Sequence, residues 1–256
     1  AFFQNDTHHN VLASAYPGAE HGDASPAVNV IDHLDRAGVA EYIDKLGKPW
    51  LEKLAPYKPD AFFVDSFELI GELPWSDRFQ AAFRQQHGYD IAPYLPLVFR
   101  RHGESKYLNM LIAPEAAHTG TNGIGQRIRE DYEATREALF RNEHVLPMKA
   151  WMTQEHIRFR LQAHGGFGDY LDNYQLADIP ESEGLFANGN FEFLKLAASA
   201  GHVANKSIIS SESFVAMAMD PQRFRADDFY YLAGNAYAAG INRLMYHGHA
   251  YAMPIQ

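Results

Sequence analysis

The chain has 256 residues, of which 46% are hydrophobic and 21% charged, so it can bury a sizeable core and lacks the composition of a disordered chain. Its 22 Lys and Arg against 32 Asp and Glu give a net charge of -10. This charge argues against a nucleic-acid partner, because such a protein needs a basic face. The absence of cysteine excludes disulfide scaffolds and cysteine nucleophiles, and no apolar run approaches the roughly 20 residues of a membrane span.

The first 30 residues are rich in Asn, His, Gly, Pro and Ser and show little periodicity, which predicts an irregular N-terminal segment over 1–30. The sequence begins at Ala1 without an initiator Met and ends at Gln256 soon after an apolar run. We therefore expect the folded region, 31–256, to be part of a larger protein. No targeting segment is visible in this sequence.

Helical spacing of apolar residues predicts a helix over 34–55, broken in two by Pro49. The short apolar run 61–64 is typical of a buried parallel strand, and it ends in Asp65-Ser66-Phe67-Glu68. A second helix is predicted from Ser76, as N-cap, to Gly88, as C-cap.

The segment 93–123 has no clear period, and helices are predicted again over 126–142 and 147–156. An alternating strand over 157–161 follows and ends near His164. The remaining expected elements are a weak strand at 176–180 leading to Glu181 and Glu183, a helix over 191–204, a strand at 207–209 leading to Glu212, a helix opened by Asp220-Pro221 and reaching Ala239, and a strand over 241–246 ending at His247.

Strands that alternate with helices predict an α/β fold with a parallel sheet. A dinucleotide fingerprint in the required context, a Walker A motif, H-E-x-x-H and G-x-S-x-G are all missing. The strands instead end repeatedly in polar or ionisable residues, which is the pattern of a (β/α)8 TIM-barrel-like domain. Only five or six strands can be counted, so this barrel is either incomplete or has its first strands upstream.

Carboxylates dominate the predicted strand ends, with Asp65 and Glu68, Glu181 and Glu183, and Glu212 following three different strands. Acids gathered at one barrel mouth raise the pKa of some members, which lets one carboxyl act as an acid and another as a base or nucleophile. Such a pair beside aromatic rings suits the hydrolysis of glycosidic bonds. The candidate rings for stacking on a sugar are Trp75, Tyr94 and Trp151.

Any single acid is more often a surface charge or a helix cap than a catalytic group. Glu183 and Glu212 are favoured as functional acids because an acid directly after an apolar strand is not needed for packing. His164 and His247 also follow strands and are candidates for binding sugar hydroxyls. The alternating pair His247 and His249 allows a metal-dependent hydrolase as a further reading, although a second pair of histidines is missing.

Several ordered motifs make the sequence resemble the α-L-rhamnosidases of glycoside hydrolase family 106. Any one motif is weakly specific, but the ordered set covers the chain from about residue 30 to its end. The motifs are Val64-Asp65-Ser66-Phe67-Glu68 followed by Trp75 and Gly88-Tyr89-Asp90, then Arg160-Leu161-Gln162-Ala163-His164-Gly165, Ile179-Pro180-Glu181-Ser182-Glu183, Ser210-Ser211-Glu212-Ser213-Phe214, and Gly240-Ile241-Asn242 leading to Tyr246-His247-Gly248.

This resemblance implies a barrel-type catalytic domain over 31–256 of a larger, periplasmic or secreted protein with further domains. It implies hydrolysis of terminal α-L-rhamnose from an oligo- or polysaccharide with inversion, assisted by Ca²⁺ and without an organic cofactor. By position, Glu183 and Glu212 would be the catalytic carboxylates, and we assign Glu183 as the acid and Glu212 as the base while the sequence leaves their order open. The resemblance places Asp65, Glu68, Trp75, His164, Glu181 and His247 at the substrate, with Asp65, Glu68 and Glu181 also as metal ligands.

Two other functions stay open at this point. A catalytically silent carbohydrate-binding barrel would neutralise Glu183 or Glu212 with a salt bridge or turn it away from the pocket. A metal-dependent hydrolase of another class would bring His247, His249 and acids together at one point.

Overall fold

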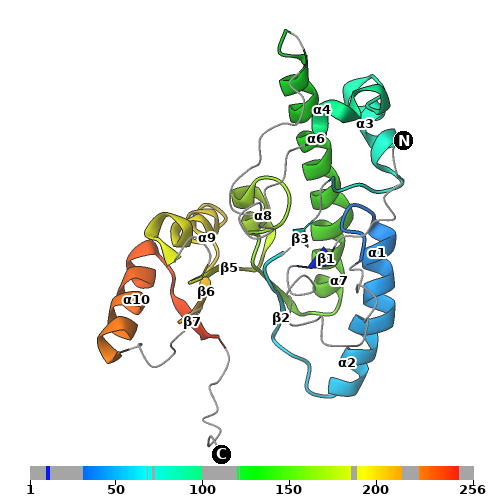
Figure 1. Ribbon diagram of the computed structural model, residues 1–256. Helices are drawn as coiled ribbons and strands as arrows, with labels where there is room; N and C mark the ends of the chain where they lie inside the picture. The colour runs from blue at the N-terminus through cyan, green and yellow to red at the C-terminus, as the bar shows by residue number, and fades with distance from the viewer. Residues whose placement is uncertain are drawn as a thin grey trace, which may run out of the picture. The chain divides into compact units, whose positions relative to one another are not determined.

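The computed structural model describes residues 10–11, 31–67, 69–70, 73–99, 120, 122–185, 189–214 and 225–247. The chain divides into two units by its internal contacts. Unit 1 takes its residues from 1–59, 66–155 and 165–169, and unit 2 from 60–65, 156–164 and 170–256. Figure 1 labels most of the helices and strands of both units.

Unit 1 is mainly helical. Its elements are α1 (Arg36–Tyr42), η3 (Ile43–Gly47), α2 (Lys48–Leu54), α3 (Phe79–His87), η4 (Ala92–Tyr94), α4 (Leu95–Val98), α6 (Ile124–Leu139), η5 (Phe140–Val145) and α7 (Leu146–Gln154), with a two-stranded antiparallel pair of β1 (Asn10–Val11) and β3 (Leu69–Ile70). Helices α3 and α4 pack on α6, and α1 packs on α7.

Two prolines lie within continuous helical segments of unit 1, where the sequence predicted breaks. A π-helical turn precedes each of them, η3 before Pro49 and η5 before Pro147. Proline lacks an N–H and its ring clashes with the carbonyl four residues earlier, so it disrupts a regular α-helix. The wider π turn shifts the hydrogen-bond partner by one residue and lets the helix continue.

Gly47 and Trp151 explain how two of these helical segments approach each other. A Cβ atom at Gly47 would lie 2.5 Å from the Trp151 ring, so only glycine fits there. The Trp151 side chain is buried in this contact. Trp151 is therefore a core residue of unit 1, which corrects its interpretation as a candidate ring for stacking on a sugar.

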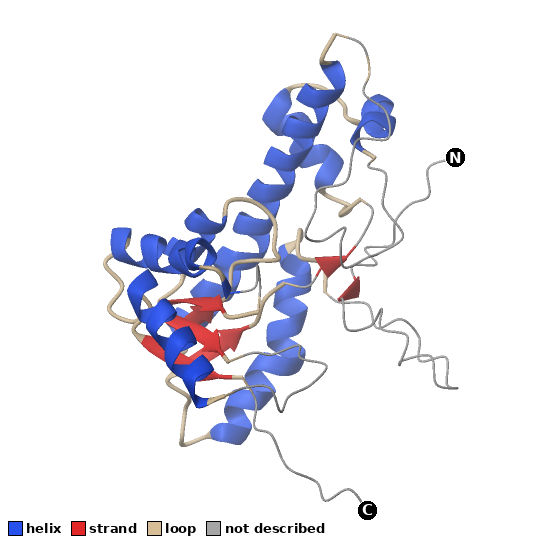
Figure 2. Cartoon of the chain, turned by 60° about the vertical axis from the view of Figure 1, so that its left-hand side comes forward, coloured by secondary structure: helices blue, strands red, loops and turns tan. Residues whose placement is uncertain are grey.

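Unit 2 is an α/β unit with a five-stranded parallel sheet. The strands are β2 (Ala61–Val64), β4 (Arg158–Leu161), β5 (Ile179–Glu183), β6 (Ser210–Ser213) and β7 (Arg243–Tyr246), in this spatial order, and the helices are α8 (Tyr170–Leu176), α9 (Phe191–Val203) and α10 (Ala226–Ala239). Helix α9 packs on β5, α8 and α10, and α10 also contacts β6 (Figure 2).

The spatial order of the strands follows their order in the chain, without a reversal. A doubly wound sheet would reverse at a switch point, whereas a barrel adds each new strand beside the last. The sheet is therefore a curled half-barrel, which confirms the predicted α/β class and an incomplete barrel.

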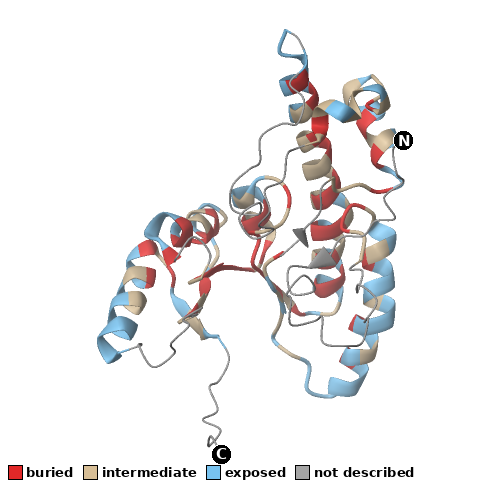
Figure 3. Ribbon diagram, in the orientation of Figure 1, coloured by how far each residue is buried: buried red, intermediate tan, exposed pale blue. Residues whose placement is uncertain are grey.

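Two strands lie further along the chain than the sequence predicted. β5 starts at Ile179 rather than near 176, and β6 occupies Ser210–Ser213 rather than 207–209. Both strands are almost entirely buried although they are polar, as Figure 3 shows for β5. The backbones of both strands pair in register with their neighbours in the sheet, so ladder pairing rather than apolar composition determines where these strands lie.

The predicted helix ends are partly right. Gly88 ends α3 in the left-handed conformation as expected, with φ of 78°, but α3 begins at Phe79 and Ser76 is not its N-cap. Asn190 caps α9 through a bond from the Phe193 backbone N–H. Helix α8 was not predicted, and Asp220-Pro221 lies outside the described residues.

Of the predicted irregular segment 1–30, the structure describes Asn10 and Val11, which form β1. No helix in the described part of the chain is long and apolar enough to cross a bilayer.

Candidate active site

Most of the predicted site residues lie at the carboxyl ends of the parallel strands in unit 2. Asp65 follows β2, His164 follows β4, and His247 follows β7. Glu181 and Glu183 are on β5, and Glu212 is on β6. In barrel enzymes the reacting groups stand at this end of the strands.

The places of three other predicted residues relative to these strand ends stay predictions. Trp75 belongs to unit 1, where its ring stacks on Phe79 with 4.6 Å between centroids. Glu68 and His249 lie outside the described residues.

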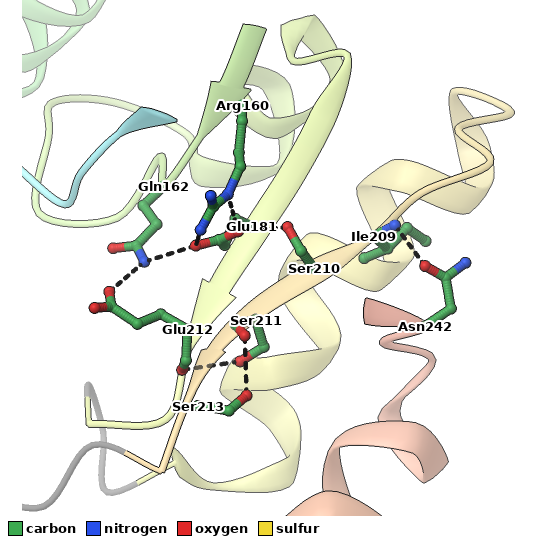
Figure 4. A network of polar contacts seen from close by, with 9 residues as sticks. All are labelled: Arg160, Gln162, Glu181, Ile209, Ser210, Ser211, Glu212, Ser213 and Asn242. Carbon is green, nitrogen blue, oxygen red and sulfur yellow. Dashed lines mark hydrogen bonds and ion pairs between the residues drawn. The ribbon is translucent and has the colours of Figure 1, made fainter. Parts of the chain in front are cut away.

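One face of the sheet carries the three glutamates of β5 and β6. Residues two apart on a strand point to the same side, which puts Glu181 and Glu183 of β5 together and Ser210 and Glu212 of β6 together. Figure 4 shows Gln162, just beyond β4, between Glu181 and Glu212. These strands therefore build one connected polar network.

Arg160 and Glu181 form the buried ion pair of this network. The guanidinium of Arg160 donates through Nε and Nη2 to the two carboxylate oxygens of Glu181. The Ser210 hydroxyl donates to one of the same oxygens. Glu181 is fully buried, and Arg160 also lies over the Phe63 ring, 4.1 Å from its centroid. A buried carboxylate that forms a bidentate ion pair with Arg is tolerated in a sheet as long as both partners remain.

Glu212 has a different environment. Gln162 Nε2 donates to its Oε2 at 2.8 Å, and His247 Nε2 lies 3.7 Å from its Oε1. Burial raises the pKa of Glu212, and the nearby charges of Asp65 and Glu183 raise it further, against the lowering effects of Gln162 and His247. A carboxyl with a raised pKa keeps its proton to a higher pH, as a general acid must.

Glu183 is held by a histidine instead. His164 Nε2 lies 2.7 Å from Glu183 Oε2, and the other ring nitrogen, Nδ1, lies 2.8 Å from the Tyr174 hydroxyl. His164 and Tyr174 are buried, and Phe193 meets the imidazole edge-on.

Glu183 and Glu212 are direct register partners of the parallel pair β5 and β6. Neighbouring strands lie about 4.8 Å apart, so the two side chains stand next to each other on one face. The geometry thus gives two adjacent carboxyls with unlike surroundings, which is the requirement for separate acid and base roles.

A calcium site needs six to eight oxygen ligands. Both oxygens of Glu181 accept hydrogen bonds from Arg160, so Glu181 does not fit the ligand role that the resemblance implied. Asp65 is exposed at the end of β2, where its carboxylate oxygens could serve as metal ligands. Glu68 lies outside the residues that the structure describes. Within the described residues, no three His, Asp or Glu side chains gather as a metal-binding group.

Arg160, Gln162 and Tyr174 complete the site but were not singled out as functional from the sequence. The signal for the first two was available, because Arg160 and Gln162 alternate along a predicted strand toward Glu181. Tyr174 had no such signal, since its short helix α8 was not predicted.

The chain has an α/β fold whose parallel half-barrel carries acids at its strand ends. A solved structure described as the rhamnosidase from Novosphingobium sp. PP1Y matches with a TM-score of 0.64 and 22% identity. The match covers 88% of this chain but 21% of that one, so the chain spans about a fifth of that rhamnosidase. At this identity the likeness supports the fold.

The family follows from the sequence. The profile of the alpha-L-rhamnosidase family, glycoside hydrolase family 106, matches residues 14–255. The chain therefore belongs to this family, which confirms the resemblance. No curated protein matches the chain.

Proposed function

We propose that the protein containing this chain hydrolyses terminal α-L-rhamnosyl linkages in a rhamnose-containing oligo- or polysaccharide, with inversion at the anomeric carbon. Membership of the alpha-L-rhamnosidase family supports the substrate. The register pairing of Glu183 with Glu212 at the strand ends supports a pair of acting carboxyls, and the proposal of inversion comes from the family resemblance.

In this mechanism Glu212 is the general acid and Glu183 the general base. The raised pKa of Glu212 supports its role as donor of a proton to the leaving oxygen while the glycosidic bond breaks. Glu183, accepting a hydrogen bond from His164, takes a proton from the water that attacks the opposite face of the sugar. This order is the reverse of the assignment made from the sequence.

The surroundings of the two acids favour catalysis over a silent binding barrel. The guanidinium of Arg160 pairs with Glu181 rather than with either candidate acid. The partners of Glu212 and Glu183 are an amide and an imidazole, which leave both carboxyls able to exchange protons.

We also propose that further parts of the full-length protein complete the barrel. Phe63 on β2 and Tyr246 on β7, at the two edges of the sheet, are 37% and 73% exposed. Additional strands beside β2 and β7 would cover these edges. From the family resemblance alone, we propose that the protein is periplasmic or secreted.

Calcium remains part of the proposal, with Asp65 and Glu68 rather than Glu181 as the protein ligands. A bound calcium ion would supply a positive charge for orienting sugar hydroxyls. Removal of calcium with EDTA, followed by its return, tests this point through the activity and through the thermal midpoint of the protein.

The activity is tested by incubating the full-length protein with aryl α-L-rhamnoside and with the corresponding aryl glycosides of other sugars. We expect rhamnose release from the first, and ¹H NMR of the fresh product should show the β-anomer. Release of the α-anomer would contradict inversion. Rhamnose binding without turnover would instead support the carbohydrate-binding alternative.

A further inference from the structure

Three buried groups form a line behind the proposed base. The Tyr174 hydroxyl of α8 lies 2.8 Å from Nδ1 of His164, and Nε2 of His164 lies 2.7 Å from Oε2 of Glu183. Exposed fractions of 1%, 0% and 7% for Tyr174, His164 and Glu183 exclude bulk water from this line.

The donors and acceptors of the three groups match in one arrangement of their protons. In that arrangement Nε2 of His164 donates to the Glu183 carboxylate, and Nδ1 of the same ring accepts. The Tyr174 hydroxyl then donates to Nδ1. Burial raises the pKa of Tyr174 well above its usual value, and the charges of Tyr170, Glu183 and Glu181 add to this effect. The phenol is consequently always protonated and always available as that donor.

We propose, resting on the function proposed above, that Tyr174 is a positioning residue that locks His164 in its Nε2–H form and thereby holds Glu183 ionised and oriented as the base. A ring nitrogen is held in one tautomer by the bond that the other nitrogen makes. Without the hydroxyl, Nδ1 has no donor from Tyr174 and the imidazole can carry its proton on either nitrogen.

The hydroxyl itself indicates this role. A phenylalanine would fill nearly the same space in the core around α8, whereas a buried hydroxyl costs free energy unless it is hydrogen-bonded. The backbone of Ala163, next to His164, also hydrogen-bonds the Tyr174 oxygen, which ties α8 to the end of β4. Among the described residues, titratable groups near this line include Tyr170 on α8, Glu181 on β5 and Glu212 on β6.

The first test compares Tyr174→Phe with wild type in the full-length protein. We expect kcat on an aryl α-L-rhamnoside to fall about ten-fold with KM nearly unchanged. Glu183 must be ionised to act as the base, and in Tyr174→Phe the hydrogen bond from His164 to the ionised carboxylate is weakened. The acidic limb of the kcat/KM profile should therefore move up by about one pH unit.

Tyr132→Phe is the matched control, because Tyr132 is also buried and its hydroxyl donates to the Pro74 carbonyl, but in unit 1. Both variants remove a buried, hydrogen-bonded hydroxyl and should lose similar thermal stability. Only Tyr174→Phe should move the pH profile. An unmoved profile in an active Tyr174→Phe protein would overturn the inference.

A second measurement does not depend on activity. The ¹⁵N shifts of histidine rings in labelled protein, assigned with a His164→Gln variant, report the tautomer of His164. We expect the Nε2–H form in wild type and a mixture in Tyr174→Phe; the Nδ1–H form in wild type would refute the inference. An inactive wild type with the Nε2–H form would reject the proposed function and leave the tautomer lock supported.

Discussion

Glu183 and Glu212 occupy the same register on the neighbouring parallel strands β5 and β6, yet each carboxyl has its own partner. His164 holds Glu183, and Gln162 holds Glu212. Two identical side chains at equivalent positions thus acquire different chemistry from the residues that surround them. The account of this site depends on that difference, and the following variants test its parts.

Replacement of Gln162 by leucine should change the titration of Glu212. The amide donates to the ionised carboxylate, so its loss should raise the pKa of Glu212 further. If Glu212 is the acid, the alkaline limb of the pH–rate profile should move upward by about one pH unit. The profile of kcat/KM between acidic and alkaline pH measures this shift, and a downward shift would contradict the acid role.

Replacement of Arg160 by methionine should destabilise the protein strongly. It leaves the fully buried Glu181 without its cation, which typically costs about 3–5 kcal/mol. The double variant Arg160→Met/Glu181→Gln should recover most of this loss, because no buried charge remains. Denaturant unfolding of the single and double variants gives the coupling free energy.

The exposed pair of Lys48 and Asp44 provides the control for this cycle. Lys48→Met should cost less than about 0.5 kcal/mol, since exposed helix pairs contribute little. Equal losses of unfolding free energy for Arg160→Met and Lys48→Met would mean that the Arg160–Glu181 pair does not behave as a buried ion pair.

Replacement of Glu212 by glutamine should stabilise the protein at neutral pH. A carboxyl whose pKa is raised in the folded state contributes stability below its unfolded pKa of about 4.5, and this contribution is lost as pH rises through the folded value. The neutral amide escapes this loss, so we expect a gain on the order of 1 kcal/mol at pH 7 that disappears below about pH 4. Thermal midpoints of both proteins across this range measure it, and a constant difference at all pH values would argue against a raised pKa.

Replacement of Gly165 by alanine should disturb the segment that follows His164. Gly165 has φ of 74°, and an added Cβ would lie 2.2 Å from the Phe67 carbonyl oxygen. Gly88 is a matched control with φ of 78° and no atom within 4 Å of an added Cβ. We expect Gly88→Ala to cost about 1 kcal/mol and Gly165→Ala clearly more, because the steric clash adds to the backbone strain. Equal losses of unfolding free energy in the two variants would show that the added Cβ at Gly165 is accommodated beside Phe67 at no extra cost.

The sequence predicted the general arrangement of the sheet because its signals are local. The apolar runs at 61–64 and 157–161 mark β2 and β4, and Gly88 marks the end of α3. The acids after these and later runs led to Glu183 and Glu212, since parallel strands bring their carboxyl ends to one edge. Both the class of fold and the position of the candidate acids were therefore predictable.

Features that depend on distant partners were not predictable. β6 consists of Ser210–Ser213, and it was placed too early because its polar side chains are buried among partners on other strands. The ion pair of Glu181 with Arg160 joins two residues that are 21 positions apart in the chain. The helices through Pro49 and Pro147 needed π turns, which local periodicity does not reveal.

The central claim is that Glu183 and Glu212 are the base and the acid, and leaving-group dependence tests it most directly. Rates of Glu183→Gln and Glu212→Gln are compared on two α-L-rhamnosides, one with an acidic phenol and one with an alcohol as the leaving group. Glu192→Gln, an exposed acid on α9, is the control and should behave as wild type.

We predict that Glu212→Gln loses at least about 100-fold on the alcohol glycoside but much less on the acidic phenol, which needs no proton donor. Glu183→Gln should lose activity on both substrates, and azide should restore it by replacing the activated water. Full activity of either variant on the alcohol glycoside would contradict the claim.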